Sequence, residues 1–158
     1  MLEDKKFYLT EKGLIRLKAE YQHLRKIKSF KTEGEVPRFL HSEDLNPEYL
    51  SFHEDLDLID ARLAEVKQIL RNVELIKMPP KDRRSVINLG ATVIVEINGE
   101  RDEFQIVGSL EANPSLGKIS NESPVGQALL SHRAGEEVVI SSPINVIYKI
   151  KKIRYQLS

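Results

Sequence analysis

Residues 47–73, PEYLSFHEDLDLIDARLAEVKQILRNV, decide the fold of the first half of the chain. Large apolar residues recur there at alternating spacings of three and four: Tyr49, Phe52, Leu56, Ile59, Leu63, Val66, Leu70 and Val73. That spacing is the a/d repeat of a coiled-coil helix. The positions between are mostly charged or polar, so the apolar stripe is narrow and favours packing against one partner helix.

The partner helix is expected just before this stretch. Thr10 suits an N-cap, and apolar residues then recur at spacings of three and four: Leu14, Leu17, Tyr21 and Leu24. Lys28 breaks the stripe, and Gly34 and Pro37 weaken or interrupt the helix beyond it. Pro47 suits the first turn of the second helix. The pattern predicts an antiparallel helical hairpin with its tip near residues 40–48, about 45 Å long if the first helix reaches residue 40.

The sequence changes character at residues 77–84, KMPPKDRR, where two prolines and a run of charges indicate an exposed linker. Beyond it, short apolar runs and an Asn98-Gly99 turn predict strands over 91–97, 102–108, 138–141 and 145–153. Ser123-Pro124 predicts an N-cap and a short helix through Leu130. We therefore expect an α+β chain with a coiled-coil hairpin domain at 1–77, a linker at 78–85, and a domain at 86–158 that has an antiparallel sheet and one short helix.

Composition excludes several classes of protein. The 158 residues include 24 Lys and Arg, 24 Asp and Glu, and no Cys, so no disulfide, Cys-based zinc site or thiol nucleophile is possible. No apolar run approaches the ~18 residues that cross a bilayer, and the first residues lack a signal-peptide core. We expect a cytoplasmic protein with no membrane partner. The histidines form no ligand set, and no phosphate-binding glycine loop or hydrolase triad is present.

The zero net charge conceals segregation along the hairpin. Residues 5–31 hold nine Lys or Arg and two acids, whereas residues 41–60 hold seven acids and no Lys or Arg. One interpretation is that opposite charges pair across the hairpin on solvated faces, where each pair contributes only about 0–1 kcal/mol. The other is that the carboxylates at the tip gather to hold a cation, and hard oxygen ligands of this kind suit Mg²⁺. Both interpretations favour an interaction protein over an enzyme.

Several blocks of the sequence resemble the GreA/GreB family of bacterial transcript-cleavage factors over nearly the whole chain. Leu9-Thr10-x-x-Gly13-x-x-x-Leu17 resembles the opening of the family's first helix, and Asn46-x-Glu48-Tyr49 with Ile59-Asp60-Ala61-Arg62-Leu63 resembles its second. In the second half the similar blocks are Leu89–Val93, Ile106–Gly108, Glu111–Asn113 and Lys118–Leu130, the last reading KISNESPVGQALL. Because that last block is long, a similarity of this kind is very unlikely to arise by chance.

The resemblance implies a fold and a function. The second domain is similar to an FKBP-like fold that docks at the rim of the RNA polymerase secondary channel, and the coiled coil carries an acidic tip to the active centre. The polymerase then cleaves its own backtracked nascent RNA, so the factor stimulates transcription elongation and is no stand-alone enzyme. Bacterial RNA polymerase, nascent RNA and transcription-complex DNA are the implied partners of a monomer, and Mg²⁺ is shared with the polymerase rather than bound stably in isolation.

Candidate residues follow from the same resemblance. The family pattern G-D-L-x-E-N-x-E-Y stands here as Glu43-Asp44-Leu45-Asn46-Pro47-Glu48-Tyr49, so two residues, including the first Glu, are missing. Asp44 is the expected catalytic, Mg²⁺-holding carboxylate, with Glu43 as the second acid and Glu48 as a further metal candidate. The expected RNA contacts are Arg25, Lys26 and Lys28. The expected polymerase contacts are Ser120, Asn121, Glu122, Ser123 and Pro124.

The shortened tip keeps two other interpretations open. A second alignment moves the gap to residues 34–37 and takes both acids out of register. In that case the chain is a Gre-like regulator that binds the channel without stimulating cleavage. A third interpretation, of another class, is an FKBP-like binding module or chaperone with a helical arm, which rests on the second domain alone.

Overall fold

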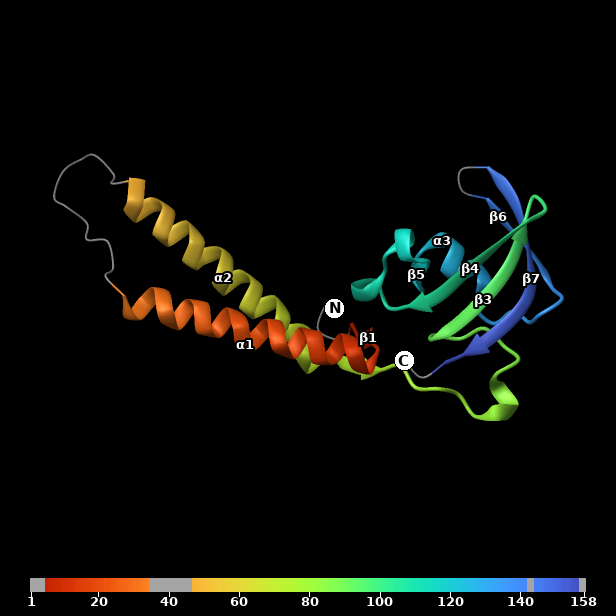
Figure 1. Ribbon diagram of the computed structural model, residues 1–158, viewed down its shortest axis with the longest axis horizontal. Helices are drawn as coiled ribbons and strands as arrows, with labels where there is room; N and C mark the ends of the chain where they lie inside the picture. The colour runs from red at the N-terminus through yellow and green to blue at the C-terminus, as the bar shows by residue number, and fades with distance from the viewer. Residues whose placement is uncertain (1–4, 35–46, 142–143, 157–158) are drawn as a thin grey trace. The chain divides into compact units, whose positions relative to one another are not determined.

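A computed structural model describes residues 5–34, 47–141 and 144–156 (Figure 1). Their contacts divide the chain into two units, residues 1–14 with 73–158 and residues 15–72. We call these the sheet unit and the hairpin unit. The first residues of the chain therefore group with its second half, whereas the expected boundary at 77 placed them with the hairpin. That boundary, with the linker at 78–85, stays a prediction about separable domains.

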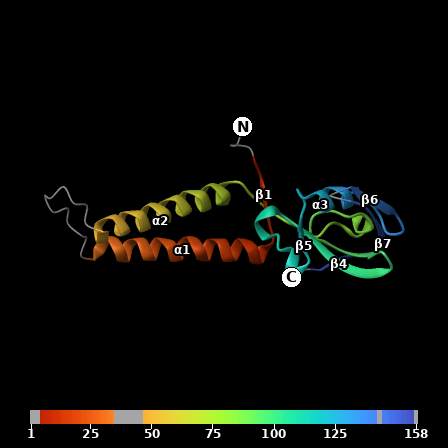
Figure 2. The ribbon, with the colours of Figure 1, turned by 90° about the horizontal axis from the view of Figure 1, so that it is seen from above.

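Two long helices form the hairpin unit. Helix α1 covers Glu11–Glu33 and α2 covers Pro47–Arg71, and all the views show them side by side (Figures 1 and 2). The helices are antiparallel, since Glu20 pairs with Arg62 while Lys31 pairs with Asp55. Every residue of the expected apolar stripe within α2 is buried or half-buried, whereas Leu58, which lies outside the stripe, is 70% exposed. The heptad spacing thus predicted the packing face correctly.

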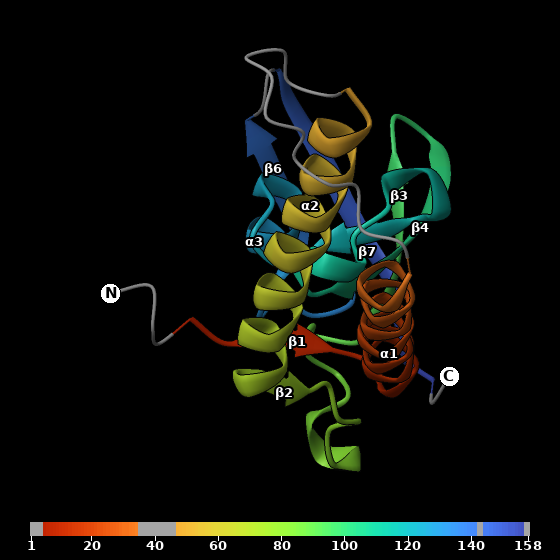
Figure 3. The same ribbon diagram turned by 90° about the vertical axis from the view of Figure 1, so that its left-hand side faces the viewer.

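The second helix ends two residues earlier than the stripe. Val73, the last apolar position of the repeat, begins strand β2 at Val73–Leu75, which pairs in parallel with β1 at Phe7–Leu9 (Figure 3). Leu9 lies opposite Leu75, and the amide of Ile76 donates to the carbonyl of Leu9 at 2.8 Å. Neither strand was expected, because runs of three residues are too short to show a period.

The sheet unit is built on five strands in the order β5-β4-β3-β7-β6. Strand β3 covers Ala91–Ile97, β4 Glu100–Val107, β5 Lys118–Ser120, β6 Glu137–Ser141 and β7 Asn145–Tyr155. The four expected strands are present, but the sheet is mixed rather than wholly antiparallel, because β4 and β5 are parallel. The β3–β4 turn has φ of 52° at Asn98 and 82° at Gly99, which the Asn-Gly pair tolerates.

The core of this unit lies between the sheet and helix α3, Pro124–Leu129, which packs beside β5 and β6 (Figure 1). Seven residues of this core are at most 1% exposed: Ile87, Ala91, Val93, Val95, Ile106, Leu129 and Ile150. Short 3₁₀ turns connect the described elements of this unit, among them η2 at Lys81–Arg83, η3 at Ser109–Glu111 and η4 at Pro114–Leu116. The α+β class is confirmed, and the small helix packs on the sheet as expected.

Candidate functional site

The segment Ser120–Pro124 forms a tight turn between β5 and α3. Ser123 is the N-cap of α3: its hydroxyl oxygen accepts from the amide of Gly126 at 3.1 Å and its hydroxyl donates to the carbonyl of Ser120 at 2.7 Å. A Cβ at Gly126 would collide with that same carbonyl. The SPVG sequence therefore fixes the turn through one hydroxyl and one position where only glycine fits.

Glu122 is exposed on this turn, but its carboxylate has partners. The hydroxyl of Ser109 donates to Glu122 Oε2 at 2.6 Å, and Lys5 Nζ lies 3.7 Å from Oε1. The amide of Glu122 donates to the hydroxyl oxygen of Ser120 at 3.0 Å. These contacts hold the negative charge in one place, so the turn presents it as a rigid feature.

The surface around the turn is partly apolar. Pro124 is exposed, and Leu110, 45% exposed, lines with Asn121 and Glu122 a small cavity of about 80 Å³. Three residues of the turn are half-buried: Ser120, Asn121 and Ser123. The amide of Asn121 donates to the carbonyl of Val107 at 2.8 Å. The five expected contact residues thus lie together, with Glu122 and Pro124 the most accessible. Sequence reasoning missed Lys5, Ser109 and Leu110, because no spacing in the sequence links them to residue 122.

Most of the basic residues expected to contact RNA have partners within the hairpin unit. Lys28 Nζ lies 2.6 Å from Asp60 Oδ1, which supports the interpretation of solvated charge pairs at that position. The Arg25 guanidinium lies 5.9 Å from the ring centre of Tyr21. Lys26 is exposed and makes no ion pair with any residue that the structure describes. Lys26 is therefore the expected RNA contact whose charge is most available.

A second ion pair between the two helices joins Glu20 to Arg62. Arg62 Nε and Nη2 donate to the two carboxylate oxygens of Glu20 at 2.6 and 3.0 Å, a two-point contact. Hydrogen bonding to Arg62 holds the pKa of Glu20 below its ordinary value. Arg62 belongs to the Ile59–Leu63 block, so the structure gives that block a role in joining the two helices.

The acids expected to hold Mg²⁺ are only partly described. Glu43 and Asp44 lie outside the described residues, and Glu48 is exposed in the first turn of α2. Within the described ranges no three His, Cys, Asp or Glu side chains group as metal ligands. The carboxylate chemistry of residues 43, 44 and 48 suits Mg²⁺, and with so few protein ligands the ion would need others from outside the chain.

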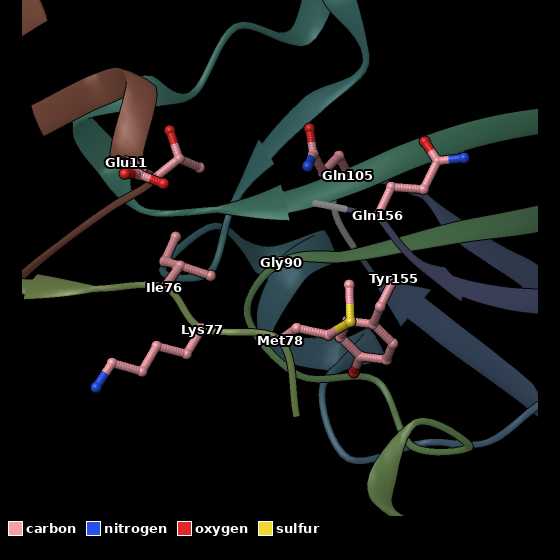
Figure 4. A pocket seen from close by; sticks show the side chains of 9 residues that line it. Glu11, Ile76, Lys77, Met78, Gly90, Gln105, Tyr155 and Gln156 are labelled. Carbon is pink, nitrogen blue, oxygen red and sulfur yellow. The ribbon is translucent and has the colours of Figure 1, made fainter. Parts of the chain in front are cut away.

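A pocket of about 80 Å³ in the sheet unit holds no catalytic set (Figure 4). Met78, Gly90 and Tyr155 line it, and the Tyr155 hydroxyl donates to the carbonyl of Val86 at 2.5 Å and accepts from the amide of Asn88 at 2.9 Å. Burial raises the pKa of Tyr155. Both hydrogen-bonding partners are main-chain groups, so the tyrosine braces the segment before β3 rather than performing chemistry.

None of the described helices is long and apolar enough to cross a membrane. The family model described as "Transcription elongation factor, GreA/GreB, C-term" matches residues 81–155. Transcription elongation factor GreA of Thermomicrobium roseum is 42% identical over 85% of this chain and 88% of its own. The same factor of Halalkalibacterium halodurans is 36% identical over 90% of this chain and 92% of its own.

Among solved structures, GreA factor homolog 1 of Thermus thermophilus is 27% identical over 95% of this chain and 99% of its own. Its TM-score of 0.42 is too low to support an argument about shape. The sequence relatives carry the assignment, since they are 42% and 36% identical over 85% and 90% of the chain. The chain belongs to the GreA/GreB family of transcription elongation factors.

Proposed function

We propose that this protein binds bacterial RNA polymerase through the Ser120–Pro124 turn and promotes cleavage of backtracked nascent RNA. The observation that carries the proposal is the 42% identity to a GreA factor over 85% of the chain. The turn supports it physically, because its exposed carboxylate is held by Ser109 and Lys5 and pays little entropy when a partner docks. The protein works in the cytoplasm as a monomer and has no enzymatic activity of its own.

The hairpin tip carries the chemical part of the proposal. Asp44 and Glu43, with Glu48 close in sequence, would hold a Mg²⁺ ion together with groups of the polymerase active centre. When bound, the ion stabilises charge on the oxygens that attack or leave in hydrolysis of a phosphodiester bond. The chain contributes the negative charge that raises occupancy of the ion, and the two helices carry that charge at the end of the hairpin.

The basic side of the hairpin adds contacts to the displaced RNA. Lys26 is the best placed by charge, since Lys28 pairs with Asp60 and Arg25 lies against Tyr21. Phosphate contacts of this kind are independent of sequence and weaken with salt.

A second function is favoured by one observation, the missing family Glu at the tip. With a single carboxylate in register, the factor would occupy the channel and regulate transcription without stimulating cleavage. The two functions separate at residue 44, because only cleavage requires the charge of Asp44.

The test is transcript cleavage by defined backtracked complexes of the cognate polymerase. We expect Asp44→Asn to lower stimulated cleavage by about 100-fold or more at unchanged polymerase affinity, as for loss of one group that stabilises transition-state charge. Glu43→Gln should lose less and recover partly with added Mg²⁺. Asp57→Asn, an exposed acid of α2, is the matched control and should cleave normally.

The docking assignment has its own measurement. Glu122→Ala should weaken polymerase binding by about tenfold, as expected for a central charged contact, while Glu100→Ala at the start of β4 should not. Equal affinity of both variants would remove residues 120–124 from the interface. A wild-type protein that binds polymerase but never stimulates cleavage across a Mg²⁺ series would establish the regulatory function instead.

A further inference from the structure

Glu111, the last residue of η3, contacts Thr10 just before α1, although the two residues are 101 positions apart in the sequence. Its Oε2 accepts from the amide of Thr10 at 2.7 Å, and its Oε1 accepts from the hydroxyl of Thr10 at 2.6 Å. The Thr10 hydroxyl oxygen in turn accepts from the amide of Gly13 at 3.1 Å, as an N-cap does. One carboxylate therefore holds the residue that begins the helix by both its main chain and its side chain.

Gly13 makes room for this contact. A Cβ at that position would collide with the carboxylate of Glu111. Gly13 is buried, and in a helix it is less favourable than alanine by about 1 kcal/mol. The chain thus carries a poor helix residue at the one place where the carboxylate of Glu111 lies against the helix.

The neighbouring backbone is fitted just as closely. A Cβ at Gly108, the N-cap of η3, would collide with the carbonyl of Tyr8 in β1. Leu9 is only 2% exposed and pairs with Leu75 of β2. Strand β1 therefore packs between η3 and β2. The contact of Glu111 with Thr10 adds a further attachment at the residue that begins α1.

These contacts bear on both ends of the hairpin. Helix α1 follows β1 through Thr10, and β2 follows α2 through Asn72. Both helices are therefore connected directly to the parallel strand pair. All the contacts described here lie inside the sheet unit, residues 1–14 with 73–158. The first turn of α1 is thus part of the sheet unit, while the rest of that helix belongs to the hairpin unit.

We propose that Glu111 is a positioning residue that clamps the first turn of α1 and thereby limits the swing of the hairpin unit about its base. This inference rests on the proposed function in one respect: the clamp matters for cleavage because the helices that lead to the tip belong to the hairpin unit, whereas the docking turn belongs to the sheet unit. A helix amplifies any looseness at its base, since each residue adds about 1.5 Å of length. A simple N-cap would stabilise α1 without affecting the range of directions that the hairpin takes.

The first test measures that range in the free protein. Because the chain has no cysteine, Ala64→Cys on α2 and Gln127→Cys on α3 create the two attachment sites for spin labels. We expect the distance distribution between the labels to broaden in Glu111→Ala and to stay unchanged in Glu100→Ala and in Thr10→Ser, which keeps the hydroxyl. An unchanged width in Glu111→Ala, with α1 intact by circular dichroism, would overturn the proposal.

Gly13→Ala separates the clamp from helix stability. Helix propensity alone predicts a stabilised α1, whereas the collision predicts displacement of the carboxylate, which sits at the flexible end of its side chain. We expect a broadened distance distribution together with amide exchange at Thr10 that is about tenfold faster, because a hydrogen bond to a charged group is lost. A narrow distribution despite fast exchange at Thr10 would show that the contact is lost without freeing the hairpin, which would overturn the proposal.

The last measurement connects the clamp to activity. In Glu111→Ala we expect stimulated cleavage at saturating factor to fall by about 10- to 100-fold, as for a misplaced catalytic group, while the concentration for half-saturation of polymerase stays the same. A parallel change in both quantities would mean damage to docking instead and would count against a positioning role. If wild type neither binds nor stimulates polymerase, the proposed function fails, but the spin-label and exchange results still decide the clamp.

Discussion

The sheet unit and the hairpin unit achieve order by different means. In the sheet unit, side chains such as Val93, Ile106 and Leu129 are wholly buried between a sheet and a helix. In the described part of the hairpin unit only Leu17, Val66 and Ile69 are buried, and ion pairs join the two helices beside a half-exposed seam. A unit built of a sheet and a helix can rely on a core, whereas a pair of helices has no interior and depends on its seam, its charges and the attachment at its base.

The largest difference in stability should appear when buried, half-buried and exposed leucines of the two units are each replaced by alanine. Leu129→Ala should lower the free energy of unfolding by about 2–5 kcal/mol, because it leaves a cavity in a closed core. Leu63→Ala in the half-buried seam should cost about 1 kcal/mol, and Leu58→Ala, at a 70% exposed position, less than about 0.5 kcal/mol. Urea unfolding of the three variants measures these values. A loss at Leu63 equal to that at Leu129 would mean that the hairpin has a core of its own.

A second contrast concerns glycines. Gly126→Ala should destabilise the sheet unit by about 1–3 kcal/mol, because the added methyl group meets the carbonyl of Ser120, a main-chain atom that cannot turn aside. Gly34→Ala beyond α1 should be nearly neutral, since its nearest neighbour, the carbonyl of Phe30, lies at an ordinary 3.5 Å. Thermal unfolding checks both. A neutral Gly126→Ala would show that the turn before α3 can shift and is no rigid docking feature.

The stability of the hairpin should depend on pH through the Glu20–Arg62 pair. Arg62 lowers the pKa of Glu20, so the folded chain takes up this proton less readily than the unfolded chain. The stabilisation is therefore full above the ordinary carboxyl pKa of 4.5 and is lost as the pH falls through the lower value of the folded state. Arg62→Gln should cost about 1 kcal/mol or less at neutral pH, since the two side chains are 41% and 37% exposed, and almost nothing in strong acid. Lys67→Gln, an exposed change on the same helix, should show no such pH dependence.

The smallest effect on stability is expected at Lys26, and it tests the assignment of RNA contacts. Lys26→Gln should change the free energy of unfolding by less than about 0.5 kcal/mol, whereas Lys28→Gln removes the partner of Asp60 and should cost slightly more. If Lys26 touches RNA, its removal should reduce action on long backtracked transcripts, and added salt should have the same effect. Equal loss on short and long transcripts would indicate a weakened hairpin rather than a lost phosphate contact.

Sequence periodicity predicted the elements that have a long or regular pattern. The heptad stripe from Tyr49 to Leu70, the Asn98-Gly99 turn and the Ser123-Pro124 helix start are all present in the structure. The three-residue strands β1, β2 and β5 could not be predicted, because their pairing depends on partners far away in the chain. Val73 shows the conflict directly: it continues the heptad but is drawn into β2 by β1.

The candidate sites were predictable to different degrees. The turn at residues 120–124 was expected from a long sequence block, and its five residues do lie together. Its surroundings were not expected, because Lys5 and Ser109 meet Glu122 only through the fold. Glu111 and Gly13 each stood in a recognised block, yet nothing in their spacing said that they touch. The tip residues Glu43 and Asp44 stay predictions.

The contacts of β1 with later segments also determine the order in which parts of the chain can fold during synthesis. Thr10 and Glu111 are 101 residues apart, so at about 5–20 residues per second the ribosome needs roughly 5–20 s after making β1 before Glu111 is even added. The hairpin, whose ion pairs span 24 to 42 residues, is complete in sequence well before that moment. The strand that is made first is therefore among the last to be fully secured: in a nascent chain halted before residue 108, residues 7–9 can pair with β2 but lack the contacts of Tyr8 with Gly108 and of Thr10 with Glu111.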